Sequence, residues 1–237
     1  MTAESYARTA PLTVRRTAGS QKRWQGVVAA GLGLGLGLVV ALSSPAAARQ
    51  LAPSVQADAV DQGASPAVHR LKSWVLQSGD NQGLPFVLID KVNAQVFVFS
   101  RDGLMLGTTP VLLGLARGDV APPDIGDRPL SAISPEERIT PSGRYVAATG
   151  PNLTGASVLW IDYDGALSLH PVRGRPADRR LQRLATPTPE DNRISYGCVN
   201  VPVAFYEDIV APTFRGTVGI VYILPEERSM AEVFPGV

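Results

Sequence analysis

Three hydrophobic patterns follow one another along this chain. Residues 26–42 form a nearly continuous apolar run, and apolar residues then recur at helical spacing over 66–77. This second segment has Pro66 near its start and Gly79 beyond its end, as helices commonly do. From residue 86 onward the pattern changes to short runs of β-branched and aromatic residues. The sequence therefore predicts a helix over 66–77 ahead of a β-rich region.

The β-rich region opens with two neighbouring runs at 86–90 and 95–99, and Asn93 between them suits a turn. Further strands are expected over 108–113, 145–148, 157–163, 166–170 and 217–223, with helices over 177–184 and 203–210. Many short strands with few helices indicate a mainly β fold, a sandwich or a barrel. We expect one domain over 85–225, with a linker and short helix at 49–84 before it and a tail at 226–237 after it.

Two segments fit none of these patterns. Residues 118–143 contain five prolines, and a connection of this length is usually functional, so we expect a lid or a binding loop. Residues 172–193 contain six arginines, against Asp178, Glu190 and Asp191. They form either a solvated helical face or a rim that binds carboxylates, for which guanidinium groups are well suited. The candidate substrate-binding residues of such a rim are Arg179, Arg180, Arg183 and Arg193.

The first 48 residues have the composition of an export leader, and we expect residues 1–48 to be a signal peptide separate from the domain. Basic residues precede the apolar run, and small residues at 44–48 suit cleavage after Ala48. The alternative is a retained membrane anchor, because the run is nearly long enough to span a bilayer. Alternating Gly and Leu at 31–38 lower its hydrophobicity and favour cleavage. We expect an exported protein of the periplasm or cell envelope, with membrane contact only through an uncleaved leader. The export route, general or twin-arginine, stays open.

Removal of the leader changes the charge balance. The leader holds five of the 22 basic and one of the 21 acidic residues, so the remaining chain has a net charge near −3. This value argues against nucleic acid as a partner. About 190 residues remain, which is enough for one domain with a core.

The single cysteine, Cys198, is the main candidate for chemistry. Exported domains gain stability by pairing cysteines, and this one has no partner in the chain. It is either a buried, inert residue or a nucleophile. A nucleophilic thiol needs a base, and His170 ends a predicted strand 28 positions upstream. The N–H groups of Gly197 and Cys198 could stabilise an oxyanion, and the carbonyl of Pro171 could fix the imidazole tautomer.

The residues around Cys198 resemble the signature of the L,D-transpeptidase catalytic-domain family. In that family a histidine and a variable spacer precede Ser/Thr-His-Gly-Cys, with Asn or Arg two residues beyond the cysteine. Here His170 and a spacer are followed by Ser195-Tyr196-Gly197-Cys198-Val199-Asn200. Residues 86–103 are similar to the paired opening strands of that domain, and 140–145 to its Thr-Pro-x-Gly turn. The resemblance covers about residues 86–223 and implies a mixed β-sandwich or barrel-like fold with a few short helices.

The resemblance also implies a reaction. Cys198 would be the nucleophile and His170 its base, while Gly197 and Cys198 would donate to the oxyanion. Ser195 and Asn200 would shape the site. Such enzymes attack the third residue of a peptidoglycan stem peptide, release the terminal D-alanine and transfer the acyl group to an amine. The family implies no metal and no cofactor.

Two departures from the family pattern bear on substrate and acceptor choice. Tyr196 stands where the family usually has histidine, so a phenol replaces an imidazole beside the oxyanion donors. The spacer is also longer than is common, and the excess is the arginine-rich segment 172–193.

Other readings of the same residues stay open. Sortase-like transpeptidases also place His before Cys, but they carry Thr-Leu-x-Thr-Cys, whereas Ser-Tyr-Gly precedes Cys198 here. Papain-like wall hydrolases have the reverse order. The same thioester chemistry with water as acceptor would give a carboxypeptidase or a cross-link hydrolase. A wall-binding module that has lost catalysis is the alternative from another class.

Overall fold

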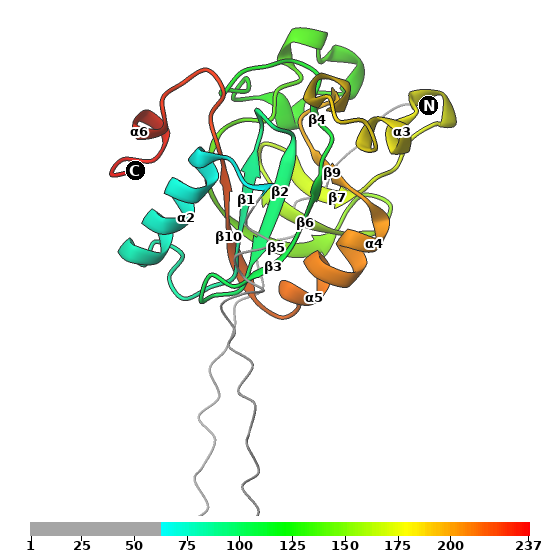
Figure 1. The fold of residues 1–237 in the computed structure, drawn as a ribbon. Helices are drawn as coiled ribbons and strands as arrows, with labels where there is room; N and C mark the ends of the chain where they lie inside the picture. Colours follow the sequence, from blue (N-terminus) through cyan, green and yellow to red (C-terminus); the bar gives the residue numbers. More distant parts are fainter. Residues whose placement is uncertain (1–62) are drawn as a thin grey trace, which may run out of the picture. The chain divides into compact units, whose positions relative to one another are not determined.

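The computed structural model describes residues 63–237, and its elements are labelled in Figure 1. The predicted leader, its cleavage after Ala48 and residues 49–62 of the linker lie outside the described residues. Within the described part, every helix is too short or too polar to cross a bilayer.

An eight-stranded sheet of order β3-β2-β1-β10-β5-β6-β7-β9 forms the framework (Figure 1). Its strands are β1 (Phe86–Asp90), β2 (Gln95–Phe99), β3 (Met105–Pro110), β5 (Gly143–Pro151), β6 (Ser157–Asp162), β7 (Leu167–Pro171), β9 (Val199–Val201) and β10 (Val218–Ile223). A second sheet pairs β4 (Leu113–Gly114) with β8 (Arg193–Ser195) in parallel. The mainly β fold with few short helices is confirmed.

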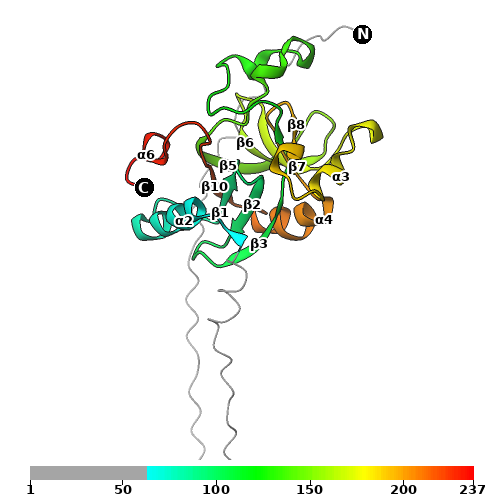
Figure 2. The same ribbon diagram turned by 45° about the horizontal axis from the view of Figure 1, so that its top comes forward.

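Alternation along the strands divides the core in two. Val87 and Ile89 of β1 belong to one cluster, and Phe86 and Leu88 belong to the other, because successive side chains point to opposite faces. The first cluster is covered by α4 (Val203–Phe205), a π-helical turn (Tyr206–Val210) and α5 (Ala211–Thr213). The second is covered by α2 (Pro66–Ser78) and α6 (Met230–Val233). Figure 2 shows α2 and α4 on opposite sides of the sheet. With both faces covered, β1 is buried along its whole length.

The predicted helix at 66–77 is present as α2. Ser65 caps its first turn by accepting a hydrogen bond from the Val68 N–H at 3.3 Å, and Pro66 occupies a position where no N–H is needed. Gly79, with a φ of 68°, ends the helix in the left-handed conformation. At the other end of the chain, Phe234 is buried in the cluster beside α2, so the segment predicted as a tail packs on the domain.

The strands expected beyond residue 100 begin or end one to three residues from their expected positions. Three elements differ for a physical reason. The strand expected over 108–113 ends at Pro110, which has no N–H to donate to a ladder. The helix expected over 177–184 is broken by Arg179, whose φ of 49° separates a 3₁₀ turn (Pro176–Asp178) from α3 (Arg180–Leu184). The helix expected to end at 210 continues to Thr213 through the π-helical turn. That turn accommodates Pro212, which cannot make a regular helical hydrogen bond.

Candidate active site

Parallel pairing of β7 with β9 brings the predicted base and nucleophile together. Leu169 pairs with Val199, and His170 pairs with Asn200. Side chains two residues apart on a strand share a face, so Ser168 and His170 lie on the same face as Cys198 and Asn200. Neither β8 nor β9 was predicted, yet these two short strands hold the cysteine loop, residues 195–198, beside the beginning of β7.

The Cys198 thiol is partly exposed and has polar neighbours. Its Sγ lies 3.6 Å from Ser168 Oγ and 3.4 Å from the carbonyl oxygen of Ala166. Burial raises the pKa of this thiol, but the hydrogen bond and charge of His170, with hydrogen bonds from Ser168, lower it, and the net pKa lies below its ordinary value. A lowered pKa increases the fraction of reactive thiolate.

The His170 ring is held at both nitrogens. Its Nδ1 lies 2.8 Å from the carbonyl oxygen of Pro171, the contact expected from the sequence. Since a carbonyl only accepts, Nδ1 carries the proton and Nε2 keeps its lone pair. Asn200 Nδ2 lies 3.2 Å from Nε2 and 3.2 Å from the carbonyl oxygen of Cys198. The neutral Nδ1–H tautomer is therefore the form in which His170 can accept a proton.

The cysteine loop is tied internally by Ser195. Its Oγ donates to the Cys198 carbonyl at 2.7 Å and accepts from the Gly197 N–H at 3.0 Å. The expectation that Gly197 donates to an oxyanion therefore needs correction, because its N–H is engaged within the loop. Gly197 is required for another reason: its φ is 134°, and a Cβ would lie 2.8 Å from the carbonyl oxygen of Ile139.

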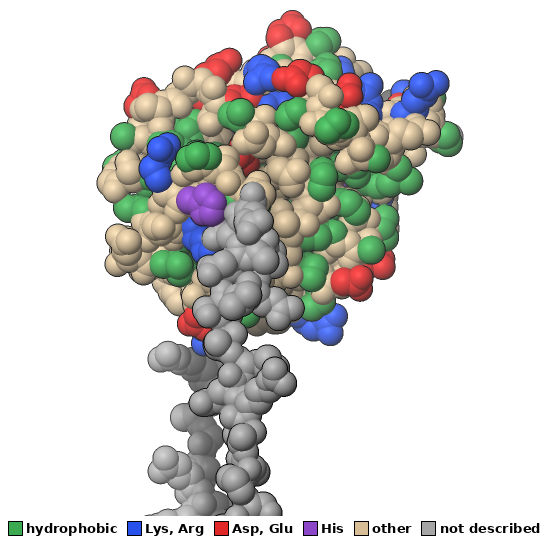
Figure 3. Space-filling model, in the orientation of Figure 1, with side chains coloured by type: hydrophobic (Ala, Val, Ile, Leu, Met, Phe, Trp, Pro, Cys, Tyr) green, Lys and Arg blue, Asp and Glu red, His purple; other side chains and the backbone are tan. Residues whose placement is uncertain are grey.

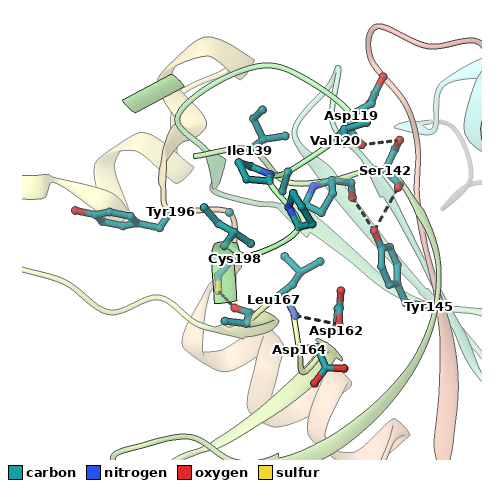
Figure 4. Close-up of a pocket in the computed structure, with 18 of the residues that line it drawn as sticks. Asp119, Val120, Ile139, Ser142, Tyr145, Asp162, Asp164, Leu167, Tyr196 and Cys198 are labelled. Atoms are coloured by element: carbon teal, nitrogen blue, oxygen red, sulfur yellow. Dashed lines mark hydrogen bonds between the residues drawn. The ribbon is translucent and has the colours of Figure 1, made fainter. Parts of the chain in front are cut away.

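Tyr196, the departure from the family pattern, stacks on the neighbouring loop. The Arg138 guanidinium lies 4.1 Å from the centre of its ring, a cation–π arrangement. Figure 4 shows the ring extending away from the side chains gathered around the pocket. Tyr196 thus connects the cysteine loop to the segment 118–143.

The thiol opens into a cavity of about 360 Å³ (Figure 4). Residues 118–143 form one wall, as expected for a binding loop, and the β6–β7 turn forms another. Asp162 and Asp164 line this second wall. Burial and the charge of Asp162 raise the pKa of Tyr145, a further wall residue, to about 12, so its phenol is protonated at neutral pH. Residues 63–237 contain no group of three His, Cys, Asp or Glu side chains placed to hold a metal ion.

The four candidate arginines have different environments. Arg193 is buried, donates to the Lys91 carbonyl at 2.9 Å and pairs with Glu226, so its assignment to a substrate-binding rim is wrong. The Arg183 guanidinium donates to the backbone carbonyls of Asp178 (3.2 Å) and Asp191 (2.8 Å), and it holds its own segment together. The two that are left are Arg179, which is exposed, and Arg180, which donates to Asn200 Oδ1 at 2.7 Å.

A buried lysine that no sequence pattern indicates holds the binding loop, residues 118–143, in place. Lys91 is fully buried, and its Nζ lies 2.6 Å from the Gly118 carbonyl oxygen, 2.6 Å from Asp119 Oδ1 and 2.9 Å from the Thr140 carbonyl oxygen. It therefore joins the two ends of the segment 118–143. The Thr140 hydroxyl in turn donates to the Gly197 carbonyl at 2.7 Å. No sequence signal identifies Lys91, because lysines are nearly always exposed.

Ser168 was also missed, although the sequence contains a signal for it. It is a polar residue between two apolar ones in a predicted strand, two positions before His170. Period-two alternation alone would have placed it on the face of the base.

Comparisons with known proteins give a likeness in structure only. No protein-family model matches the chain, and no curated protein matches its sequence. One similar structure is an L,D-transpeptidase of Enterococcus faecium, with 17% identity, a TM-score of 0.34, and 59% of this chain and 49% of that chain covered. Another is an L,D-transpeptidase from Mycobacterium smegmatis, with 16% identity, a TM-score of 0.35, and coverage of 59% and 58%. A third is the helical cell shape determining protein of Campylobacter jejuni, with 17% identity, a TM-score of 0.41, and coverage of 66% and 56%.

This chain thus spans about half the length of the solved proteins it resembles.

Proposed function

We propose that this protein is an exported cysteine acyltransferase, an L,D-transpeptidase that acts on peptidoglycan stem peptides. The observation that supports this proposal is the arrangement of Cys198, His170 and Ser168 on one face of the β7–β9 pair. The Cys198 thiol has a lowered pKa and opens into a cavity large enough for a peptide segment. This is the arrangement that acyl transfer through a thioester requires.

The reaction proceeds in two halves. His170 Nε2 takes the thiol proton, and Sγ attacks the carbonyl carbon of the third stem residue. The Cys198 N–H is our candidate oxyanion donor, because that of Gly197 is engaged by Ser195. The imidazolium returns the proton to the departing amine of D-alanine, which leaves a thioester on Cys198. An acceptor amine then attacks, its proton passes to His170, and the thiol is regenerated as the new amide forms.

An amine rather than water is the acceptor we propose. Asp162 and Asp164 line the cavity beside Cys198, and their carboxylates favour the approach of an ammonium group. Water is the competing acceptor, and it would make the protein a hydrolase with the same first half-reaction.

Incubation of the full chain with a tetrapeptide-stem muropeptide, followed by mass spectrometry, tests the proposal. We expect an acyl adduct on Cys198 with loss of one D-alanine, and an exchanged or cross-linked product when amines are added. Cys198→Ala should form no adduct, and His170→Gln should form it slowly at neutral pH and faster at alkaline pH, where the thiol ionises unaided. Free tripeptide as the main product would indicate the hydrolase. Absence of any adduct on the parent protein would exclude both and leave a wall-binding module.

A further inference from the structure

A second cavity, of about 370 Å³, lies within the arginine-rich segment. Its charged lining residues are all basic, and they are Arg173, Arg175, Arg179 and Arg180. Lys and Arg side chains are visible in Figure 3 on the projection where Figure 1 labels α3. The cavity is separate from the one that contains Cys198, since the two have no lining residue in common.

Few acidic groups balance these arginines. Arg175 is largely exposed and lies 3.4 Å from Asp178, the one acidic residue between positions 172 and 189. The side chains of Arg173 and Arg179 make no hydrogen bond or ion pair with any residue in 63–237. Guanidinium groups at this density attract an anion, and their planar donor pairs match the two oxygens of a carboxylate.

Arg180 has an unused donor within this cluster. Its Nε is buried and forms an ion pair with Asp178 Oδ2 at 3.6 Å, but it has no hydrogen-bond partner among the described residues. A buried N–H without an acceptor is uncommon in proteins and costs free energy. An anion in the cavity would supply the acceptor that Arg180 lacks.

Arg180 also connects the cavity to the catalytic base. Guanidinium groups only donate, so the Asn200 atom 2.7 Å from Arg180 Nη1 is the oxygen. The amide nitrogen therefore faces His170 Nε2 and the Cys198 carbonyl. In this orientation the unprotonated Nε2 of His170 accepts a hydrogen bond from Asn200 Nδ2. Once Nε2 is protonated, Asn200 offers it no acceptor.

We propose that the arginine-lined cavity binds a carboxylate and that Arg180 couples its occupancy to His170 through Asn200. A bound carboxylate draws Arg180 away from Asn200, the amide turns, and Oδ1 accepts a hydrogen bond from protonated Nε2. The thiolate–imidazolium pair becomes more favourable when the cavity is filled. This deepens the proposed function and rests on it for the source of the carboxylate, a peptide of the wall.

The test measures binding and coupling on the full chain without requiring turnover. The probes are N-acetyl-D-alanine, its neutral amide and inorganic phosphate. Binding is followed through the ¹⁵N-labelled arginine Nε–H signals, and coupling through the rate at which iodoacetamide alkylates Cys198 near pH 6.5. We expect N-acetyl-D-alanine to shift the Arg180 signal and to raise the alkylation rate about threefold or more, since that rate follows the thiolate fraction. The amide should do neither.

Four variants separate the two parts of the proposal. Arg173→Gln with Arg179→Gln should weaken carboxylate binding about tenfold, whereas Arg215→Gln, an exposed arginine outside the cavity, should not. Arg180→Ala should raise the basal alkylation rate and abolish its response to the probe, and Arg180→Lys should restore part of the response. Equal binding of acid and amide, or an unchanged pH profile of alkylation in Arg180→Ala, would overturn the inference. Tighter binding of phosphate than of the acid would overturn the carboxylate assignment.

Failure of this inference and failure of the proposed function give different results. A thioester on Cys198 without carboxylate binding overturns only the cavity assignment. Carboxylate binding and coupling without a thioester overturn only the proposed reaction.

Discussion

The two segments that flank the cysteine loop, 118–143 and 172–193, are both rich in charges and proline, yet their charges act differently. In the first, Asp119 is buried and accepts hydrogen bonds from Lys91 and from the backbone N–H groups of residues 226–228. In the second, Arg179 is exposed and the Nε of Arg180 is unsatisfied. The first set of charges holds the wall of the site in place. The second set is available to a ligand.

The comparison shows that residue type alone does not assign a charge to structure or to binding. Arg193 and Arg180 belong to the same run of sequence, but Arg193 meets the buried carboxylate of Glu226, whereas Arg180 meets the amide of Asn200. A buried ionic group must be paired, so its partner determines its role.

The largest expected effect comes from breaking the ionic cluster under the binding loop. Lys91→Met leaves Asp119 buried without its cation and removes one of the cations beside Glu226, which keeps its ion pair with Arg193. The free energy of unfolding should fall by about 3–5 kcal/mol. Urea unfolding measures the loss. Arg215→Met, at an exposed position, is the matched control and should change stability by less than about 0.5 kcal/mol. If both variants unfold at the same urea concentration, Lys91 does not hold the loop.

A smaller loss should follow acidification. Burial raises the pKa of Asp119, but hydrogen bonds from Lys91 and from the backbone of residues 226–228 lower it by more than burial raises it. The net pKa is about 2, compared with 3.8 in an unfolded chain. Because the folded pKa is lowered, this group stabilises the fold above pH 3.8, and the contribution of roughly 2.5 kcal/mol is lost as the pH falls through 2.

Unfolding in urea at several pH values between 5 and 2 measures this contribution. Asp119→Asn should be less stable than the parent at pH 5, and its stability should depend less on pH. An equal pH dependence in the two proteins would contradict the assignment to Asp119.

The connection from the binding loop to the cysteine loop should be weaker. Thr140→Val removes a hydroxyl that donates to the Gly197 carbonyl and accepts from the Gly114 N–H, and both groups are buried. We expect a stability loss of about 1–3 kcal/mol. We also expect a lower kcat for acyl transfer, because the cysteine loop loses its support. Thr140→Ser keeps the hydroxyl and should retain most of the stability and most of the kcat. If Thr140→Ser loses as much as Thr140→Val, the effect comes from packing and not from the hydroxyl.

The smallest expected effect on stability belongs to the arginine-rich segment. Arg173→Gln with Arg179→Gln should change the free energy of unfolding by less than about 0.5 kcal/mol, because both side chains are exposed and unpaired with described residues. The same variant should raise KM for an anionic stem peptide more than it lowers kcat. A stability loss similar to that of Lys91→Met would remove the distinction between the two segments.

Local pattern determined several features of this protein. The strands Phe86–Asp90 and Gln95–Phe99 have the predicted bounds, because each is a short apolar run that ends at polar turn residues and is buried on both faces. Helix α2 follows from apolar spacing, a proline at the start and a glycine at the end. The candidate chemistry, one thiol and one imidazole in that order, also comes from sequence alone, and its catalytic role stays a prediction.

Tertiary structure decided the rest. The β7–β9 pairing joins residues about 30 positions apart, and nothing local specifies its register or the strands β8 and β9. The same holds for Lys91 and Arg193, whose partners Asp119 and Glu226 come from distant segments. A charge is structural when folding buries it against a partner, and it is free for a ligand when folding does not. The sequence of residues 172–193 shows six arginines, but only the folded chain shows which of them already bind a carboxylate or a carbonyl of the protein.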